Sequence, residues 1–298
     1  MHVAAVDAAR PFHKDLISLT KPRIISLLLV TTVAPKYVAG SPRLMTVCWV
    51  SLGGYHMAGG ANAVNMYLDG DIDDVMARTR LRPIPSGRMA PRAVIAFGIA
   101  LATAATYLLA HFVNVLTAAL ALAGFYFYVF VYTRWLKRSS PQNIVIGGAA
   151  GAFPPLVGWA AVTGRVDLAS VFLFLIVFYW TPPHFWALAL NKQADYRRAG
   201  VPMAPLVWGE RETIDQMLWY SVLLVALTVL PACIGTFGLI YVVSALVLGG
   251  LLLRGVWRVR AAQAGGAWSK PAWWVYKYSL LYLALLFVAM VVDRHVSR

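Results

Sequence analysis

The residues of this chain best suited to chemistry lie between Asn65 and Arg88, in the sequence NMYLDGDIDDVMARTRLRPIPSGR. The stretch follows an apolar segment, yet it holds four of the twelve carboxylates of the chain and four of its 26 Lys and Arg residues. Asn65, Asp69 and Asp73 recur at every fourth position, so a helix that continues through them places all three on one face, about 6 Å apart per step. Three oxygen donors on one face are suited to a hard cation such as Mg²⁺.

The remainder of the stretch fits an anion bound beside that cation. Unpaired carboxylates at a membrane boundary repel one another and are costly to desolvate, so a metal ion with an anionic substrate explains them better than packing does. Arg78 and Arg82 follow the acids and would meet such a substrate. Two prolines and a glycine then predict a loop over residues 79 to 92 that closes over the site. The alternative is a solvated helix end followed by an ordinary polar loop.

A second polar group follows the proline pair at 182 and 183, in TPPHFWALALNKQADYRRAGVPMAP. Two prolines inside an apolar segment break or kink a membrane helix, and protein or water must then satisfy the freed backbone groups. Lys192 and Asp195 follow about one turn apart. Lys137 and Arg138, near the middle of the chain, could also hold phosphate oxygens, although topology alone places cations there.

The elements that must position these residues are membrane helices. The chain is 60% hydrophobic and 13% charged, with a mean hydropathy of +0.67, which is typical of a polytopic membrane protein. We therefore predict an all-α fold in a single membrane-embedded domain, residues 1–298. Because Asp69 and Asp195 each follow an apolar helix, two four-helix repeats over about 20–138 and 143–260 are possible. The nine expected spans are 24–40, 44–64, 93–111, 113–133, 143–162, 168–190, 216–234, 236–256 and 273–292.

The positive charges predict the orientation of these spans. Lys and Arg residues gather in alternate loops, 21 of the 26 on one side, and short loops rich in positive charge remain cytoplasmic. The amino terminus is therefore expected in the cytoplasm and the carboxy terminus outside. The net charge of +14 reflects this bias and gives no reason to expect a nucleic acid partner. The first 15 residues make a poor transit peptide, so a bacterial inner membrane is the expected location.

The chain resembles the UbiA superfamily of membrane prenyltransferases, and within it the branch that acts on heme. The resemblance rests on NxxxDxDIDxxMxRTxxRPxxxGR from Asn65 to Arg88, and the DIDxxMxRTxxRP portion is the part that selects the heme branch. Gly70 is a departure, because many members have Arg there. Further matching segments are LTKPRIISLLLVTT at 19–32, YTRWLKRSSPQNIVIGGAAGAFPPLVGW at 132–159, PPHFWALALNKQADYRRAGVPM at 182–203 and, more weakly, KYSLLYLALLF at 277–287.

The resemblance implies a nine-helix bundle that transfers the farnesyl group of farnesyl diphosphate to a vinyl group of heme B, which yields heme O and diphosphate. It also implies an active site on the cytoplasmic side and a possible downstream heme-modifying partner enzyme. A contact between His184 and heme is implied as one option, with helix capping as the other. The implied Mg²⁺ ligands are Asn65, Asp69, Asp73 and Asp195, with Asp71 as a further one, and the implied diphosphate-binding cations are Arg78, Arg82, Lys137 and Lys192.

Two alternatives stay open at this point. Another UbiA-type enzyme, acting on a different aromatic or tetrapyrrole acceptor, would share the metal and diphosphate residues and differ in the acceptor pocket. A secondary transporter would belong to a different class of protein. Transporters tend to place acids and broken helices near the bilayer midplane, whereas the carboxylates here gather at the predicted cytoplasmic ends of helices.

Overall fold

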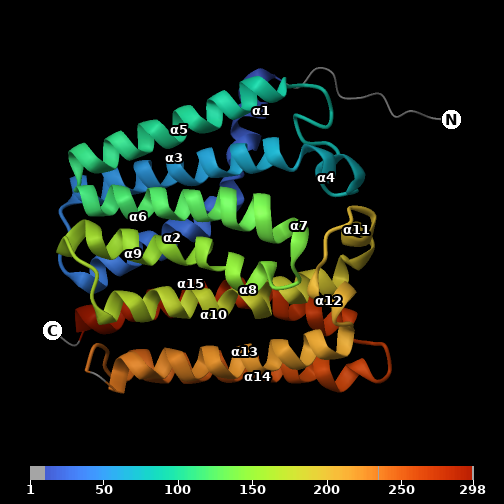
Figure 1. Cartoon of the computed structure of the whole chain (residues 1–298). Helices are drawn as coiled ribbons and strands as arrows, with labels where there is room; N and C mark the ends of the chain where they lie inside the picture. Colours follow the sequence, from blue (N-terminus) through green and yellow to red (C-terminus); the bar gives the residue numbers. More distant parts are fainter. Residues whose placement is uncertain (1–10, 234, 297–298) are drawn as a thin grey trace.

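The computed structural model describes residues 11–233 and 235–296, and every regular element in these ranges is helical (Figure 1). Arg10 and Arg298, which contributed to the predicted orientation, lie outside the described residues. The long helices run side by side, and α15 ends at the end of the bundle opposite to α4 (Figure 1). The cytoplasmic location of the amino terminus remains a prediction.

A helix covers most of the described residues of each of the nine predicted spans, but the count of nine is not confirmed. In the described part of the chain, seven helical segments are long and apolar enough to cross a membrane, and an eighth is added if the bent pair α1 (Phe12–Thr20) and α2 (Pro22–Ala39), which meet at 43°, is one span. The seven are α5 (Pro91–Phe112), α6 (Val115–Tyr126) with η1 (Phe127–Leu136) and α7 (Lys137–Ser139), α8 (Asn143–Gly147) with α9 (Ala149–Thr163), α10 (Leu168–Asn191), α13 (Glu210–Cys233), α14 (Leu239–Gln263) and α15 (Ser269–Val296).

The segment missing from that count is α3 (Leu44–Leu68), which spans 25 residues. It contains four glycines between positions 53 and 60 and also His56, Asn62 and Asn65, so it is less apolar than its neighbours. The asparagines are buried, and Asn62 donates a hydrogen bond from Nδ2 to the carbonyl of Thr20 at 2.9 Å. Protein contacts thus satisfy the polar groups of this helix.

The short helices gather at one end of the bundle. Four of them, α4 (Gly70–Val75), α7, α11 (Gln193–Arg198) and α12 (Ala204–Val207), lie on the right in Figure 1. Most of the residues singled out for chemistry are therefore presented at this end. A buried carboxylate at the opposite end, Asp293, accepts hydrogen bonds from the backbone N–H groups of Gly238 and Tyr241 at 2.6 and 3.1 Å. Because those groups lie at the start of α14, Asp293 caps that helix.

Glycine permits the closest helix contacts. A Cβ atom built on Gly60 of α3 would lie 2.6 Å from the carbonyl oxygen of Gly98 in α5, and one built on Gly158 of α9 would lie 1.9 Å from the carbonyl oxygen of Thr32 in α2. Neither obstacle is a flexible side chain, so the two backbones would have to separate. Small residues thus bring α3 against α5 and α2 against α9.

Gly158→Ala is expected to lower the free energy of unfolding by about 3 kcal/mol or more, the cost of forcing extra volume into a packed helix contact. Gly250→Ala is the matched control, because a Cβ there meets nothing within 4 Å. Thermal unfolding of both variants in the same detergent measures the difference. Equal midpoints would show that α2 and α9 do not pack this closely.

Candidate active site

The first cluster forms where α3 passes into α4. The main helix ends at Leu68, and Asp69 stands at the junction with φ −94° and ψ 9°. The hydrogen-bond spacing nevertheless continues, since the N–H of Asp69 bonds to the carbonyl of Asn65 at 2.9 Å and the N–H of Asp73 to that of Asp69 at 2.8 Å. All three side chains are buried. The three residues, spaced four positions apart, therefore follow the predicted helical spacing despite the break in the helix.

Asp69 lies at the centre of this cluster. Its Oδ2 accepts hydrogen bonds from Asn65 Nδ2 at 2.7 Å and from Lys137 Nζ at 2.5 Å. Its Oδ1 is buried without a hydrogen-bond partner, and Arg138 Nη2 lies 4.0 Å away. A buried carboxylate oxygen without a partner is costly, and a hard cation is a suitable partner for it. The chemistry of Asp69 thus fits a Mg²⁺ ligand.

Asp73 and the loop that follows it are held together by a second ion pair. Arg82 Nη1 donates to Asp73 Oδ2 at 2.5 Å, and Thr79 Oγ1 donates to the backbone carbonyl of Asp73 at 3.0 Å. Further along, Arg88 pairs with the buried Asp15 of α1 at 3.0 Å. These contacts hold the loop between α4 and α5 against Asp73 and α1. The predicted loop over residues 79 to 92 ends earlier, because α5 begins at Pro91, and its closure over the site remains a prediction.

Asp71 takes no part in the buried cluster. Its side chain is 65% exposed, and both carboxylate oxygens accept from Arg138 at 2.7 Å. Arg138 also donates to the carbonyl of Leu68 at 2.7 Å, which satisfies a group at the end of α3. The hydrogen bonds from Arg138 lower the pKa of Asp71 to about 2, so this carboxylate is charged throughout the neutral range. Asp71 thus holds the Arg138 side chain in position by two hydrogen bonds.

Asp71→Asn is expected to reduce enzymatic activity by less than about tenfold, because an exposed ion pair contributes little free energy. Initial rates at saturating substrate measure the effect. A loss as large as that expected for a buried ligand of the cluster would show instead that Asp71 binds the metal ion directly.

Lys21 is part of the cluster, although it was not among the residues predicted to bind the metal ion or the diphosphate. It lies at the bend between α1 and α2, with φ 55° and ψ 62°, and it is the one non-glycine residue with positive φ in the described ranges. Its Nζ donates to Asn65 Oδ1 at 2.9 Å, while Asn65 Nδ2 also donates to the buried hydroxyl of Thr133 at 3.1 Å. The amide oxygen predicted as a metal ligand thus faces an ammonium group. Asn65 can serve the metal ion only if Lys21 turns away.

The second cluster, on α11, is arranged differently. Asp195 is buried and pairs with Arg198 of its own helix, while Lys192 Nζ lies 5.7 Å from the ring centre of Trp273 in α15. Burial raises the pKa of the Tyr196 phenol, and the charge of Arg78 opposes that effect. Arg78 therefore lies within electrostatic reach of α11, which links the loop after α4 to this cluster.

Within residues 11–233 and 235–296, no three His, Cys, Asp or Glu side chains lie close enough to hold a metal ion together. Mg²⁺ in enzymes is commonly held by one or two carboxylates, water and substrate phosphates, so a smaller set is sufficient. Asp69 and Asp73 are the buried acids predicted to form such a set. The role of Asp195 as a further ligand remains a prediction.

Comparison with known proteins identifies the family. The model of the UbiA prenyltransferase family matches residues 27–281. The chain belongs to this family. A protoheme IX farnesyltransferase of Roseiflexus sp. strain RS-1 is 57% identical over 94% of this chain and 52% of its own length. One of Symbiobacterium thermophilum is 52% identical over 94% of both proteins. The chain thus spans about half the length of the first relative and nearly all of the second.

Solved UbiA structures share the fold. A structure of digeranylgeranylglyceryl phosphate synthase matches 95% of this chain and 98% of its own, with a TM-score of 0.74 and 18% identity. A UbiA homologue from Archaeoglobus fulgidus bound to DMAPP and Mg²⁺ matches 92% of this chain and 99% of its own, with a TM-score of 0.63 and 14% identity. At this identity the likeness concerns the fold alone.

In this UbiA chain His184 belongs to the packing between α10 and α15. Its ring stacks on Trp180 at 4.4 Å and on Tyr276 at 4.9 Å between centroids. Its Nδ1 lies 2.8 Å from the hydroxyl oxygen of Ser279. The observed role is a contact between two helices, and a contact with heme remains a prediction.

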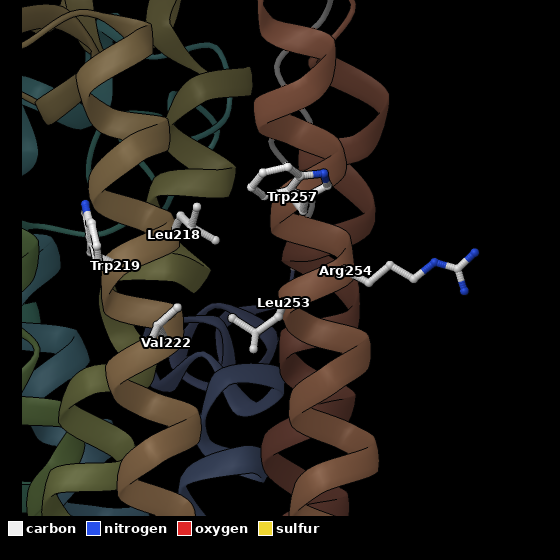
Figure 2. A pocket seen from close by; sticks show the side chains of 6 residues that line it. All are labelled: Leu218, Trp219, Val222, Leu253, Arg254 and Trp257. Atoms are coloured by element: carbon white, nitrogen blue, oxygen red, sulfur yellow. The ribbon is translucent and has the colours of Figure 1, made fainter.

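A surface groove of the bundle is separate from the UbiA site. It has a volume of about 490 Å³ between α13 and α14 and is lined by Leu218, Trp219, Val222, Leu253, Arg254 and Trp257. Figure 2 shows the leucines and Val222 directed into the gap, whereas Arg254 extends away from it. No carboxylate lines this groove, so it cannot contribute oxygen ligands to a metal ion.

Proposed function

We propose that this chain transfers the farnesyl group of farnesyl diphosphate to a vinyl group of heme B, with formation of heme O and release of diphosphate. The support is the identity of 47–57% to relatives named protoheme IX farnesyltransferase, together with the heme-branch motif from Asn65 to Arg88. The observation that carries the proposal is the buried set of Asp69 and Asp73, each in contact with a cation from elsewhere in the chain.

Asp69 and Asp73 are the proposed holders of Mg²⁺, with Asn65, Asp195 and Asp71 as the further candidates. The A. fulgidus homologue bound to DMAPP and Mg²⁺ supports a metal-dependent site for a prenyl diphosphate. When bound, the ion supplies positive charge to the diphosphate oxygens and so favours departure of the leaving group.

In the proposed mechanism, the cations of the cluster bind the diphosphate. In the structure, Lys21 contacts Asn65, and Arg82, Lys137 and Arg138 contact three carboxylates. When the carboxylates bind the ion, Lys137 and Arg82 can exchange a carboxylate oxygen for a diphosphate oxygen. Arg78 and Lys192, which have no ion pair among the described residues, would approach the same anion. Preformed donors of this kind stabilise developing charge at little reorganisation cost.

The proposed reaction needs no protein nucleophile. The bond between the allylic carbon and oxygen breaks, and diphosphate leaves with the electron pair. The vinyl π-bond of heme B then forms the new carbon–carbon bond, and water adds to the resulting cation next to the ring and loses a proton. The loop after α4, which Arg82 holds against Asp73, would limit access of water to the allylic cation until that step.

The proposed location is the bacterial inner membrane, with the lipid bilayer around the spans and the acid cluster at the cytoplasmic side. A downstream heme-modifying enzyme is the proposed consumer of the product. Membranes that contain the protein are expected to convert farnesyl diphosphate and heme B to heme O, detected by mass spectrometry. If membranes that prenylate another aromatic or tetrapyrrole acceptor leave heme B unchanged, the alternative acceptor is favoured.

Removal of divalent metal with EDTA is expected to abolish heme O formation, and Mg²⁺ in excess is expected to restore it. The physical reason is that Asp69 and Asp73 cannot favour departure of an anionic leaving group without an intervening cation. Full activity after exhaustive chelation would contradict the metal assignment, even if the farnesyl transfer itself were correct.

A further inference from the structure

A second polar site lies apart from the acid cluster, between the residues preceding α8 and the helices α10 and α13. It is a cleft of about 250 Å³, smaller than the roughly 300–1,000 Å³ of typical pockets for drug-sized ligands. It shares no residue with the acid cluster or with the groove in Figure 2. Its lining residues are Gln142, Trp186, Trp208, Glu212, Gln216 and Tyr220.

The first observation that points to a ligand concerns Trp186. Its side chain is completely buried, yet its indole Nε1 has no hydrogen-bond partner. Contacts with Trp208, at 5.8 Å and 75° between rings, and with Tyr220, at 5.4 Å and 89°, hold the indole in place. A buried indole N–H normally has a hydrogen-bond acceptor, so an oxygen atom of a ligand in the cleft would supply the acceptor that Trp186 lacks.

The second observation concerns Glu212. Its Oε1 accepts a hydrogen bond from Gln216 at 2.9 Å, and the carboxylate forms no ion pair with any described residue. The neighbouring acids of α13 are occupied, because Glu210 accepts from Gln193 and Asp215 pairs with Arg260, both at 2.7 Å. Glu212 is exposed at the edge of the cleft, and in a chain with a net charge of +14 a carboxylate without an ion pair is suited to an external cation.

We propose that this cleft binds the headgroup of a phospholipid that carries a primary amine. The ammonium group would bind Glu212 beside the rings of Trp208 and Tyr220, and a phosphate oxygen would accept from Trp186. The cleft lies near the start of a membrane-spanning helix, the depth at which tryptophan residues and lipid headgroups meet. An anionic phosphoglycerol headgroup lacks the cation and is repelled by Glu212. A trimethylated choline headgroup cannot donate a hydrogen bond to the carboxylate.

Lipid selectivity of the unmodified chain is the first test. The purified full-length protein is exchanged into nanodiscs that contain phosphatidylethanolamine, phosphatidylcholine or phosphatidylglycerol, and retained lipid is counted by native mass spectrometry. Phosphatidylethanolamine is expected to be retained about tenfold more strongly than either of the others, the ratio expected for a charge-assisted hydrogen bond. Equal retention of the three lipids, or preference for phosphatidylglycerol, would overturn the proposal.

Two variants then assign the contacts. Glu212→Gln is expected to lower retention of phosphatidylethanolamine about tenfold, and Trp186→Phe, which removes the indole N–H, to lower it severalfold. The matched control is Asp215→Asn, which removes a charge from the same helix outside the cleft and is expected to leave lipid retention unchanged. Equal loss in Glu212→Gln and Asp215→Asn would show a general charge effect and contradict a specific headgroup site.

Discussion

Asp69→Asn is expected to reduce heme O formation roughly a thousandfold while the protein still folds and inserts into the membrane. Asp69 is the buried carboxylate on which Asn65 and Lys137 converge, and its free Oδ1 is the best-placed oxygen for a metal ion. An amide retains the shape and the ability to accept a hydrogen bond, but it lacks the charge that attracts Mg²⁺. The measurement is the initial rate in membranes with matched protein content.

The matched control is Asp74→Asn on the same short helix. Asp74 is exposed and makes no side-chain hydrogen bond or ion pair with another described residue, so its replacement is expected to leave the rate within about twofold of the original. If Asp69→Asn retained the original rate, Asp69 would have no part in the mechanism. If both variants lost activity equally, the number of acids near α4 would matter more than their positions.

Lys21→Met is expected to lower kcat/KM for farnesyl diphosphate roughly a hundredfold, mainly through a higher KM. The ammonium group contacts Asn65 Oδ1 and is one of the four cations beside the acids. Without this ammonium group, less positive charge is available to attract the diphosphate. Methionine retains most of the side-chain length and leaves the bend between α1 and α2 unchanged, so the thermal midpoint is expected to shift by only a few degrees.

A purely structural role of Lys21 gives a different pattern. In that case the thermal midpoint would fall and the KM of the folded fraction would not change. Lys14→Met serves as the control, because Lys14 is an exposed cation of α1 with no ion pair among the described residues. An unchanged KM in Lys21→Met would exclude Lys21 from diphosphate binding and leave the assignment of Asp69 intact.

Local patterns in the sequence were sufficient for much of the fold. Apolar runs predicted the helical segments, because a chain in a bilayer must satisfy its backbone hydrogen bonds internally. The spacing of four positions between Asn65, Asp69 and Asp73 predicted that the three side chains share one face, since helical periodicity depends only on neighbouring residues. The count of nine spans is not confirmed, because α3 contains polar groups, and these are satisfied by buried contacts that the sequence does not show.

The partners of the acids could not be predicted in this way. Lys137 was expected near the diphosphate, but its contact with Asp69 joins residues 68 positions apart. Lys21 and Asn65 are 44 positions apart, and the left-handed backbone that directs Lys21 toward Asn65 leaves no pattern in the sequence. The positions of Lys192 over Trp273 and of His184 between aromatic rings also join distant parts of the chain.

The sequence by itself thus determined the helical membrane architecture and the family, and it predicted the acids that would hold a metal ion, because each is encoded by residue types at short, regular spacing. Only the tertiary structure decided which cation meets which acid and which polar groups remain without a partner. Those contacts depend on how closely distant helices approach. Gly60 against Gly98 and Gly158 against Thr32 control that approach, and no local pattern specifies it.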